Sequence, residues 1–163
     1  MKNTSICFSG HRPSKLPRGE ELKNLKIKLY RAVDRAVDEG FNTFYFGACI
    51  GFDLFAAMAV IVRRKRKKPT DSGDIRLIAV VPFRNQPHKW SESDKRLYYE
   101  LLSYCDDVVY LSENYHTGCY HERNRYMVDR SSRLICYYDG SGGGTSYTVD
   151  YAEKQGLGIT NLY

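Results

Sequence analysis

Residues 20–47 read EELKNLKIKLYRAVDRAVDEGFNTFYFG, and the change of pattern inside this stretch decides the fold. Apolar residues first recur every three or four positions, which is the spacing of one buried helix face, and Gly40 ends that pattern. The run at 43–47 then has the aromatic and β-branched residues of a strand. A similar run, TSICFS at residues 4–9, precedes the helix. The sequence therefore predicts strand, helix and strand in succession, which favours a parallel pair joined by a helix.

The same alternation continues to the end of the chain. We expect helices at residues 20–39, 51–66, 91–105, 121–130 and 145–155, and strands at 4–9, 43–47, 75–81, 107–111, 133–138 and 158–162. Short strands that alternate with longer helices are typical of a parallel sheet with helices on both faces. We therefore predict an α/β fold, a single Rossmann-like three-layer domain over residues 1–163, with a mostly parallel sheet of about six strands.

Composition limits the class of protein. The 163 residues are 42% apolar, which is enough for one core, and the polar segment 67–74 is too short to divide domains. Since no run resembles a signal peptide or reaches transmembrane length, we expect a cytoplasmic protein with no membrane partner. The five cysteines form no C-x-x-C pair and the four histidines are scattered, so we expect reduced thiols and no metal site.

The charge balance is basic. With 25 Lys and Arg against 19 Asp and Glu, the net charge of +6 suits phosphate-bearing partners of any size. The densest cationic run, RRKRKK at residues 63–68, falls at the predicted end of a helix. There cations complement the helix dipole and face solvent. The alternative for this run is a patch that contacts DNA.

A ligand site is expected outside the carboxyl ends of the strands of such a sheet. After the first predicted strand come Ser9, Gly10, His11 and Arg12. The glycine permits close approach of the backbone and the arginine could hold a phosphate. The alternative is a tight turn with an exposed arginine.

The second predicted strand leads into a glycine-bracketed turn. Gly47, Ala48 and Gly51 come before a helix whose amides and dipole attract anions. Asp53, near that helix start, could cap the helix, hydrogen-bond ribose hydroxyls or act as a general base. It is the one catalytic candidate that the residues offer.

The sequence DGSGGGT at residues 139–145 gives the strongest phosphate-binding signal in the chain. Its small residues, Gly142, Gly143, Gly144 and Thr145 among them, let backbone amides converge on an anion before the last helix. No Lys-Ser/Thr pair follows the glycines, which disfavours a P-loop that hydrolyses ATP. A flexible surface turn is the alternative.

Two further clusters lie near these loops. Arg123 and Asn124 open the helix at 121–130, and because Arg125 cannot share a helix face with Arg123, we expect one of the two arginines to reach a ligand. After the third predicted strand, Gln86 and Trp90 offer an amide and an aromatic surface suited to a nucleobase. Ordinary packing of Trp90 is the alternative.

Together these clusters resemble the SLOG superfamily, which includes the DprA/Smf proteins and the LOG phosphoribohydrolases. The nearest likeness is to its YspA/YpsA-like branch, also called domain of unknown function 1273. The resemblance covers nearly the whole chain. It rests on SGHRP at 9–13, VPF at 81–83 with Gln86 and Trp90, RNR at 123–125, MVDRS at 127–131 and GGT at 143–145. It implies a Rossmann-like fold with a site for a nucleotide or nucleotide derivative, and for many members of the branch no established reaction.

One position departs from the LOG pattern. Those enzymes carry a catalytic glutamate three residues after the threonine of their glycine loop, and this chain has Thr148 there. Cleavage of an N-glycosidic bond passes through a cationic sugar, which a carboxylate stabilises. The resemblance therefore does not carry this activity over unless Asp53 or Glu122 substitutes. The DprA branch, which binds single-stranded DNA, resembles the chain at 51–53, at 123–125 and in the glycine loop.

We therefore expect a nucleotide or a nucleotide-derived, ADP-ribose-like small molecule as ligand, with no cofactor required. Its phosphate would lie on residues 142–145 and Arg123, its ribose near 47–53 and its base toward Gln86 and Trp90. The role would be sensing, sequestering or weak processing. The alternatives are DprA-like binding of single-stranded nucleic acid and a protein-interaction module with a vestigial pocket. A homo-oligomer is left open.

Overall fold

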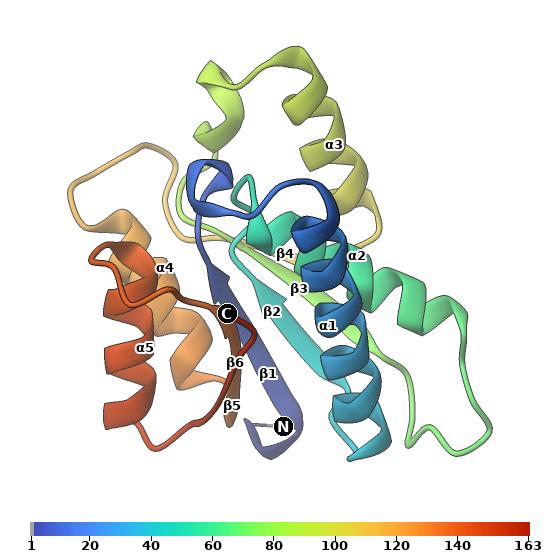
Figure 1. Cartoon of the computed structure of the whole chain (residues 1–163). Coiled ribbons are helices and arrows are strands. Elements are labelled where there is room, and N and C mark those ends of the chain that lie inside the picture. Colours follow the sequence, from blue (N-terminus) through green and yellow to red (C-terminus); the bar gives the residue numbers. More distant parts are fainter. Residues whose placement is uncertain (1) are drawn as a thin grey trace.

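The computed structural model describes residues 2–163. Within them six strands form one sheet in the order β4-β3-β2-β1-β5-β6, and every neighbouring pair is parallel (Figure 1). The strands are β1 (Ser5–Gly10), β2 (Thr43–Phe46), β3 (Arg76–Val81), β4 (Asp107–Tyr110), β5 (Arg133–Tyr137) and β6 (Gly158–Asn161). The helices are α1 (Gly19–Asp38), α2 (Phe52–Lys65), α3 (Glu92–Ser103), α4 (Cys119–Asp129) and α5 (Gly144–Lys154). The predicted Rossmann-like, three-layer α/β fold is confirmed, and the sheet is parallel throughout.

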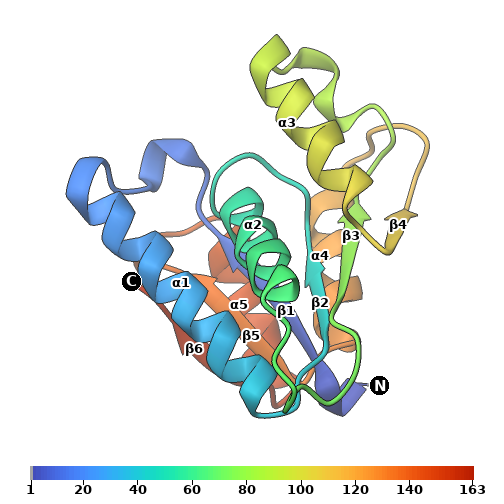
Figure 2. The same ribbon diagram turned by 90° about the vertical axis from the view of Figure 1, so that its right-hand side faces the viewer.

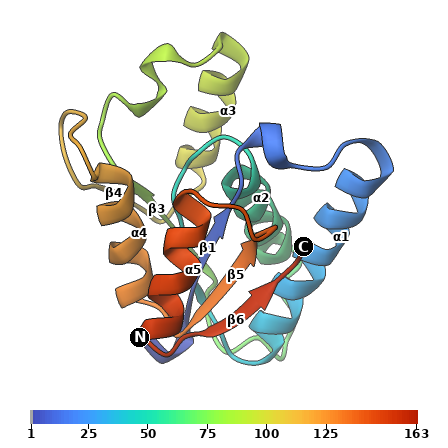
Figure 3. The same ribbon diagram turned by 60° about the vertical axis from the view of Figure 1, so that its left-hand side comes forward.

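The helices cover both faces of the sheet. Figure 2 shows α1 and α2 in front of it, and Figure 3 brings α4 and α5 forward on the other side. Along β1, Ile6 and Phe8 pack with α1 and α2, whereas Cys7 packs with α4 and α5. Because both faces are buried, the central strands have apolar residues at successive positions and not at alternate ones.

The ends of the elements follow from particular residues. Gly40, which ends the α1 pattern, has φ +98°, a conformation that favours glycine. Ser91 caps α3 by accepting a hydrogen bond from the Asp94 amide at 3.2 Å. Each predicted helix and strand is present, with ends within two residues of the prediction. The short 3-10 helices η1 (Lys2–Thr4), η2 (Pro13–Lys15) and η3 (Gln86–Lys89) were not predicted, because such short elements carry no periodicity.

The prediction that the cationic run at 63–68 faces solvent is wrong for Arg63. Its side chain is fully buried, and its guanidinium lies 2.7 Å from Asp34 and 2.5 Å from Asp71, whose side chain is only 1% exposed. We call Arg63 and these two aspartates, with Asp38 and Lys68, the Arg63 cluster. It lies at the amino ends of β2 and β3, where α1 and α2 end.

The other cations of the run are also largely paired. Ion pairs join Arg64 to Asp106, Lys67 to Asp74, and Lys68 to Asp34 and Asp38. Most of the charge in the run is thus paired within the protein, unlike a patch that contacts DNA.

Two expectations from composition can be compared with the fold. All five cysteines are free thiols, in agreement with the prediction. Across residues 2–163, no helix combines the length and the apolar character that crossing a lipid bilayer needs. A cytoplasmic location stays a prediction.

Candidate functional site

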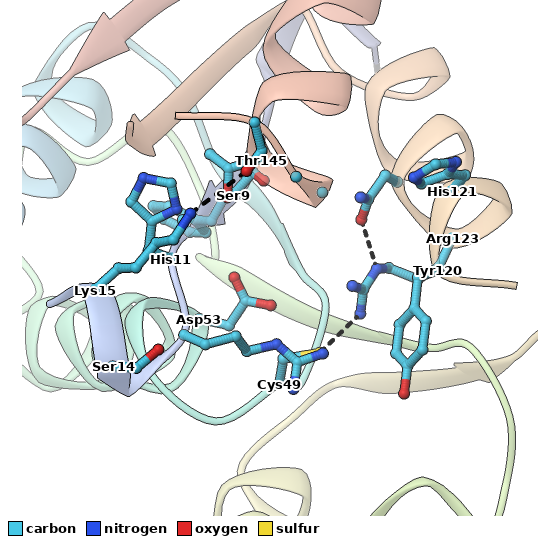
Figure 4. Close-up of a pocket in the computed structure, with 17 residues that line it drawn as sticks. Ser9, His11, Ser14, Lys15, Cys49, Asp53, Tyr120, His121, Arg123 and Thr145 are labelled. Carbon is cyan, nitrogen blue, oxygen red and sulfur yellow. Dashed lines mark hydrogen bonds between the residues drawn. The ribbon is translucent and has the colours of Figure 1, made fainter. Parts of the chain in front are cut away.

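A cavity of about 420 Å³ opens at the carboxyl ends of β1 and β5, beside the first turns of α4 and α5 (Figure 4). The strand order reverses between β1 and β5, since β2, β3 and β4 follow β1 on one side while β5 and β6 lie on the other. In open parallel sheets ligands bind at this switch point. The cavity therefore lies where the topology predicts a site.

The loop at residues 139–143 is held in place by a polar network. The Asp139 carboxylate accepts hydrogen bonds from the Ser141 amide at 2.9 Å and hydroxyl at 2.5 Å, and it lies 2.8 Å from His11 Nε2. Lys15 Nζ donates to Ser141 Oγ at 2.8 Å and to the Gly142 carbonyl at 3.4 Å. The hydrogen bonds from Ser141, reinforced by His11, lower the pKa of Asp139 to about 2. This network argues against a loose surface turn.

The glycines of this loop present the start of α5 to the cavity. Gly143 is the N-cap residue of α5 with φ +137°, and it supplies no side-chain cap. A side chain would be strained in this conformation. A Cβ added at Gly142, Gly143 or Gly144 would meet nothing within 4 Å, so the space beside the loop is open. The first amides of α5 and the positive end of its dipole are thus available to an anion.

Arg123 and Asp53 form a buried charged wall of the cavity. Arg123 Nε donates to Asn124 Oδ1 at 2.7 Å, and Nη1 donates to the Gly47 carbonyl. Burial raises the pKa of Asp53, while the charge of Arg123 and backbone hydrogen bonds from Cys49 and Gly47 act in the opposite direction. Asp53 therefore binds the loop before α2, and that helix has no side-chain cap at its N-cap residue.

Gly47 makes room for this wall. A Cβ at position 47 would lie 2.6 Å from Arg123 Cζ and 2.8 Å from Asp53 Oδ2, closer than real Cβ contacts. Any side chain here would displace one of the two charged groups. Gly47 is thus required for packing behind the cavity, and it does not line the cavity itself.

The structure brings most of the predicted ligand residues together. Eleven of them line the cavity: Ser9, Gly10, His11, Arg12, Asp53, Arg123, Asn124, Gly142, Gly143, Gly144 and Thr145. Ala48 and Gly51 lie behind it with Gly47. Ala48 is fully buried. At Gly51 an added Cβ would approach the His11 carbonyl to 2.8 Å.

Gln86 and Trp90 do not line the cavity. Gln86 is buried, donates from Nε2 to the Ala48 carbonyl at 3.0 Å and contacts Cys49 Sγ at 3.5 Å. Trp90 packs edge-to-face on Tyr98 with ring centroids 5.3 Å apart. Ordinary packing, the alternative for Trp90, agrees with these contacts. The structure therefore gives no support to a base position at these two residues.

The two arginines of α4 point to different surroundings, as their spacing predicts. Arg123 lines the cavity, whereas Arg125 does not and donates instead to the Tyr147 hydroxyl at 2.7 Å.

Sequence reasoning missed several other residues that line the cavity. Tyr120 and His121 could have been found, because they begin a helix next to the switch point, where a ligand is expected. No feature of the sequence pointed to Lys15. The missed residues are Phe8, Ser14, Lys15, Cys49, Tyr120 and His121.

Comparisons with known proteins agree with this fold. The model of the YspA SLOG family matches residues 6–158. A Bacillus subtilis relative, the uncharacterized SPbeta prophage-derived protein YoqJ, is 29% identical over 147 residues, which are 82% of this chain and 83% of that protein.

Two solved structures share the fold at low identity. DNA processing protein A (DprA) from Streptococcus pneumoniae has a TM-score of 0.66 at 17% identity over 98% of this chain. DprA from Helicobacter pylori, solved to explain its single-stranded DNA binding mode, has a TM-score of 0.65 at 14% identity, again over 98% of this chain. The likeness covers 50% of the first protein and 65% of the second. It shows a shared fold.

Proposed function

The chain belongs to the YspA SLOG family, and from this premise we propose that it binds a nucleotide or nucleotide-derived small molecule in the cavity between β1, β5, α4 and α5. The phosphate would sit at the N-terminus of α5. One observation carries this proposal: the start of α5, which no side chain caps, faces a cavity whose walls supply His11, Arg12, Lys15 and Arg123.

The charges of the cavity favour an anionic ligand. Among the described residues that line it, Asp53 is the one carboxylate, and it lies beside Arg123. Arg12 and Lys15 are exposed at the rim, where they can reach an incoming phosphate. Charge-assisted hydrogen bonds to phosphate are stronger than neutral ones, and a helix N-terminus adds to them. The volume of about 420 Å³ also suits a small molecule.

We expect a nucleotide to raise the melting temperature of the protein, because a ligand that binds only the native state stabilises it. In Arg123→Met the same nucleotide should bind about ten- to a hundredfold more weakly, since one charge-assisted contact contributes about 1.5–3 kcal/mol. A thermal-shift screen of nucleoside mono- and diphosphates and ADP-ribose identifies the ligand. Calorimetric titration then measures the affinities.

Arg123 is buried, and its loss leaves the Gly47 carbonyl without a partner, so this variant is also expected to be less stable. Affinities are therefore measured well below its melting temperature. Lys15→Met removes an exposed rim charge, together with its hydrogen bonds to Ser141 and Gly142, and should also weaken binding. Arg125→Met, on the same helix outside the cavity, is the matched control and should bind normally. If no phosphate-bearing compound shifts the melting temperature at millimolar concentration, the proposal fails.

Binding of single-stranded nucleic acid is the second candidate function. It is favoured by the shared fold with the two DprA structures, one of which was solved to explain single-stranded DNA binding. The net charge of +6 is compatible with it. The run at 63–68 offers little unpaired charge, so a strand would have to use the cations of the cavity.

Salt dependence separates the two candidates. Neutralising several phosphates of a strand releases counterions, so six contacts with a single strand lose roughly three-hundredfold in affinity between about 50 and 200 mM salt. A mononucleotide makes one or two such contacts and should lose little. We expect the second behaviour when a labelled nucleotide and a labelled oligonucleotide are titrated over the same salt series. Tight oligonucleotide binding with a steep salt dependence would favour the DprA-like function instead.

A further inference from the structure

Three aromatic side chains meet beside the cavity. Phe83 follows β3, Tyr115 lies in the loop between β4 and α4, and Tyr120 is in the first turn of α4. The Phe83 ring packs edge-to-face on Tyr115 at 5.6 Å and on Tyr120 at 6.1 Å, and the two tyrosine rings are 6.4 Å apart. We call these residues the aromatic platform. The segment after β3 supplies Phe83 and the segment after β4 supplies both tyrosines, so the platform forms only when the fold brings these two segments together.

The platform is continuous with the cationic part of the cavity. Tyr120 lines the cavity, as Figure 4 shows, and its ring lies 5.6 Å from the Arg12 guanidinium and 5.8 Å from that of Arg123. Both contacts are within the range of cation–π attraction. A ligand whose phosphate approaches these arginines would therefore place its next group near Tyr120.

Tyr115 is the most exposed of the three rings. It is 62% exposed, while Phe83 and Tyr120 beside it are half-buried. Its contacts with the other two rings fix its place at the outer end of the platform. A flat ligand that leaves the cavity past Tyr120 would meet this exposed ring, and aromatic faces stack on flat rings.

We infer that the base of the ligand stacks on Tyr115, whose ring plane is tilted by 53° from that of Tyr120, with the nucleotide extending from the start of α5 past Arg12 and Tyr120 to the outer end of the aromatic platform. This rests on the proposed function, and it locates the base at a different place from Gln86 and Trp90. Every nucleobase has a π-face, so stacking on tyrosine tolerates any base. The site should therefore prefer a nucleotide to a sugar phosphate without a base, and should distinguish poorly between bases.

The experiment compares two probes that differ by the base. Ribose 5-phosphate and the four nucleoside 5′-monophosphates are titrated calorimetrically into the full chain. We expect the monophosphates to bind about tenfold or more tighter than ribose 5-phosphate, as expected from the contribution of one stacked base. Tyr115→Ala should remove most of this preference by weakening the monophosphates about tenfold, and it should leave ribose 5-phosphate unchanged.

Two further variants make the result specific. Tyr115→Phe keeps the ring and should keep the preference. Tyr99→Ala removes another exposed tyrosine, 58% exposed on α3, and should change neither affinity. If Tyr115 serves only to pack its loop, Tyr115→Ala lowers the melting temperature and leaves the ratio of the two affinities as it was, which would overturn the inference.

The remaining outcomes separate this inference from the proposed function. If ribose 5-phosphate binds the unmodified protein as tightly as the monophosphates, or if Tyr115→Ala weakens both probes equally, the platform does not hold the base and the phosphate site stands. If neither probe binds at millimolar concentration, the proposed function itself fails and the inference fails with it.

Discussion

Purified protein is expected to release free base from nucleoside monophosphates on the order of a hundred- to a thousandfold more slowly than an enzyme with a carboxylate at the position of Thr148. Thr148 is 1% exposed, and its hydroxyl donates to the Gly144 carbonyl at 2.9 Å within α5. It does not line the cavity, and a neutral hydroxyl cannot offset the charge that develops on the sugar. Chromatographic detection of free base over hours measures the rate.

Asp53 is the carboxylate that could overturn this expectation, because it lines the cavity. Burial raises its pKa, and it is already engaged with the Cys49 and Gly47 amides beside Arg123. Turnover near one per second would refute the prediction, and its loss in Asp53→Asn would identify Asp53 as the catalytic group. Thr148→Glu and Thr148→Gln form a matched pair. A gain in the first alone would show that a carboxylate was the missing element.

Replacing Arg63 by methionine is expected to lower the free energy of unfolding by about 3–5 kcal/mol. Methionine keeps much of the volume but leaves Asp71, whose side chain is 1% exposed, without its cation. Removing one partner of a buried ion pair is costly because the remaining charge stays desolvated. Urea denaturation, followed by circular dichroism, measures the change. Lys67→Met is the control: its pair with Asp74 is exposed, so stability should hardly change.

The same pair gives a pH dependence with a defined sign. The hydrogen bond from the Arg63 guanidinium, together with the Lys68 amide, lowers the pKa of Asp71 from 3.8 to about 2. A carboxyl whose pKa is lower in the folded state stabilises the protein above its unfolded pKa, and this contribution is lost as the pH falls toward the folded value. Stability should therefore decline between about pH 4 and 2, and Arg63→Met should show a shallower decline. Equal stability or an equal decline would refute the role of the pair.

The order of helices and strands could be read from the sequence because the helices are long enough to show a period and the strands are short runs of apolar and β-branched residues between them. The apolar spacing of α1 and the Ser91 cap of α3 are local signals, and the structure has both. The burial of Arg63 could not be predicted this way. Its three aspartates belong to the end of α1 and to the loop before β3, and their approach depends on how α1 and α2 pack.

The site was predictable where its residues directly follow a strand or begin a helix. Gly10 ends β1, His11 follows it, and the glycines at 142–144 lead from β5 into α5, so the topology rule brings them to one edge. Gln86 shows the limit, because polarity does not reveal whether an amide faces a ligand or, as here, a backbone carbonyl. Lys15 and Tyr115 lie in connections without periodicity, so only the folded chain shows what they neighbour.

The Arg63 cluster and the cavity lie at opposite ends of the same sheet, the first where β2 and β3 begin and the second where β1 and β5 end. Within residues 2–163 no hydrogen bond or ion pair joins the Arg63 cluster to the residues that line the cavity. The effects of such distant, unconnected positions on stability are close to additive. If the proposed function holds, descendants of this sequence could exchange Arg12, Lys15 or Tyr115, and so acquire a new ligand, while the ion pairs that secure the scaffold remain untouched.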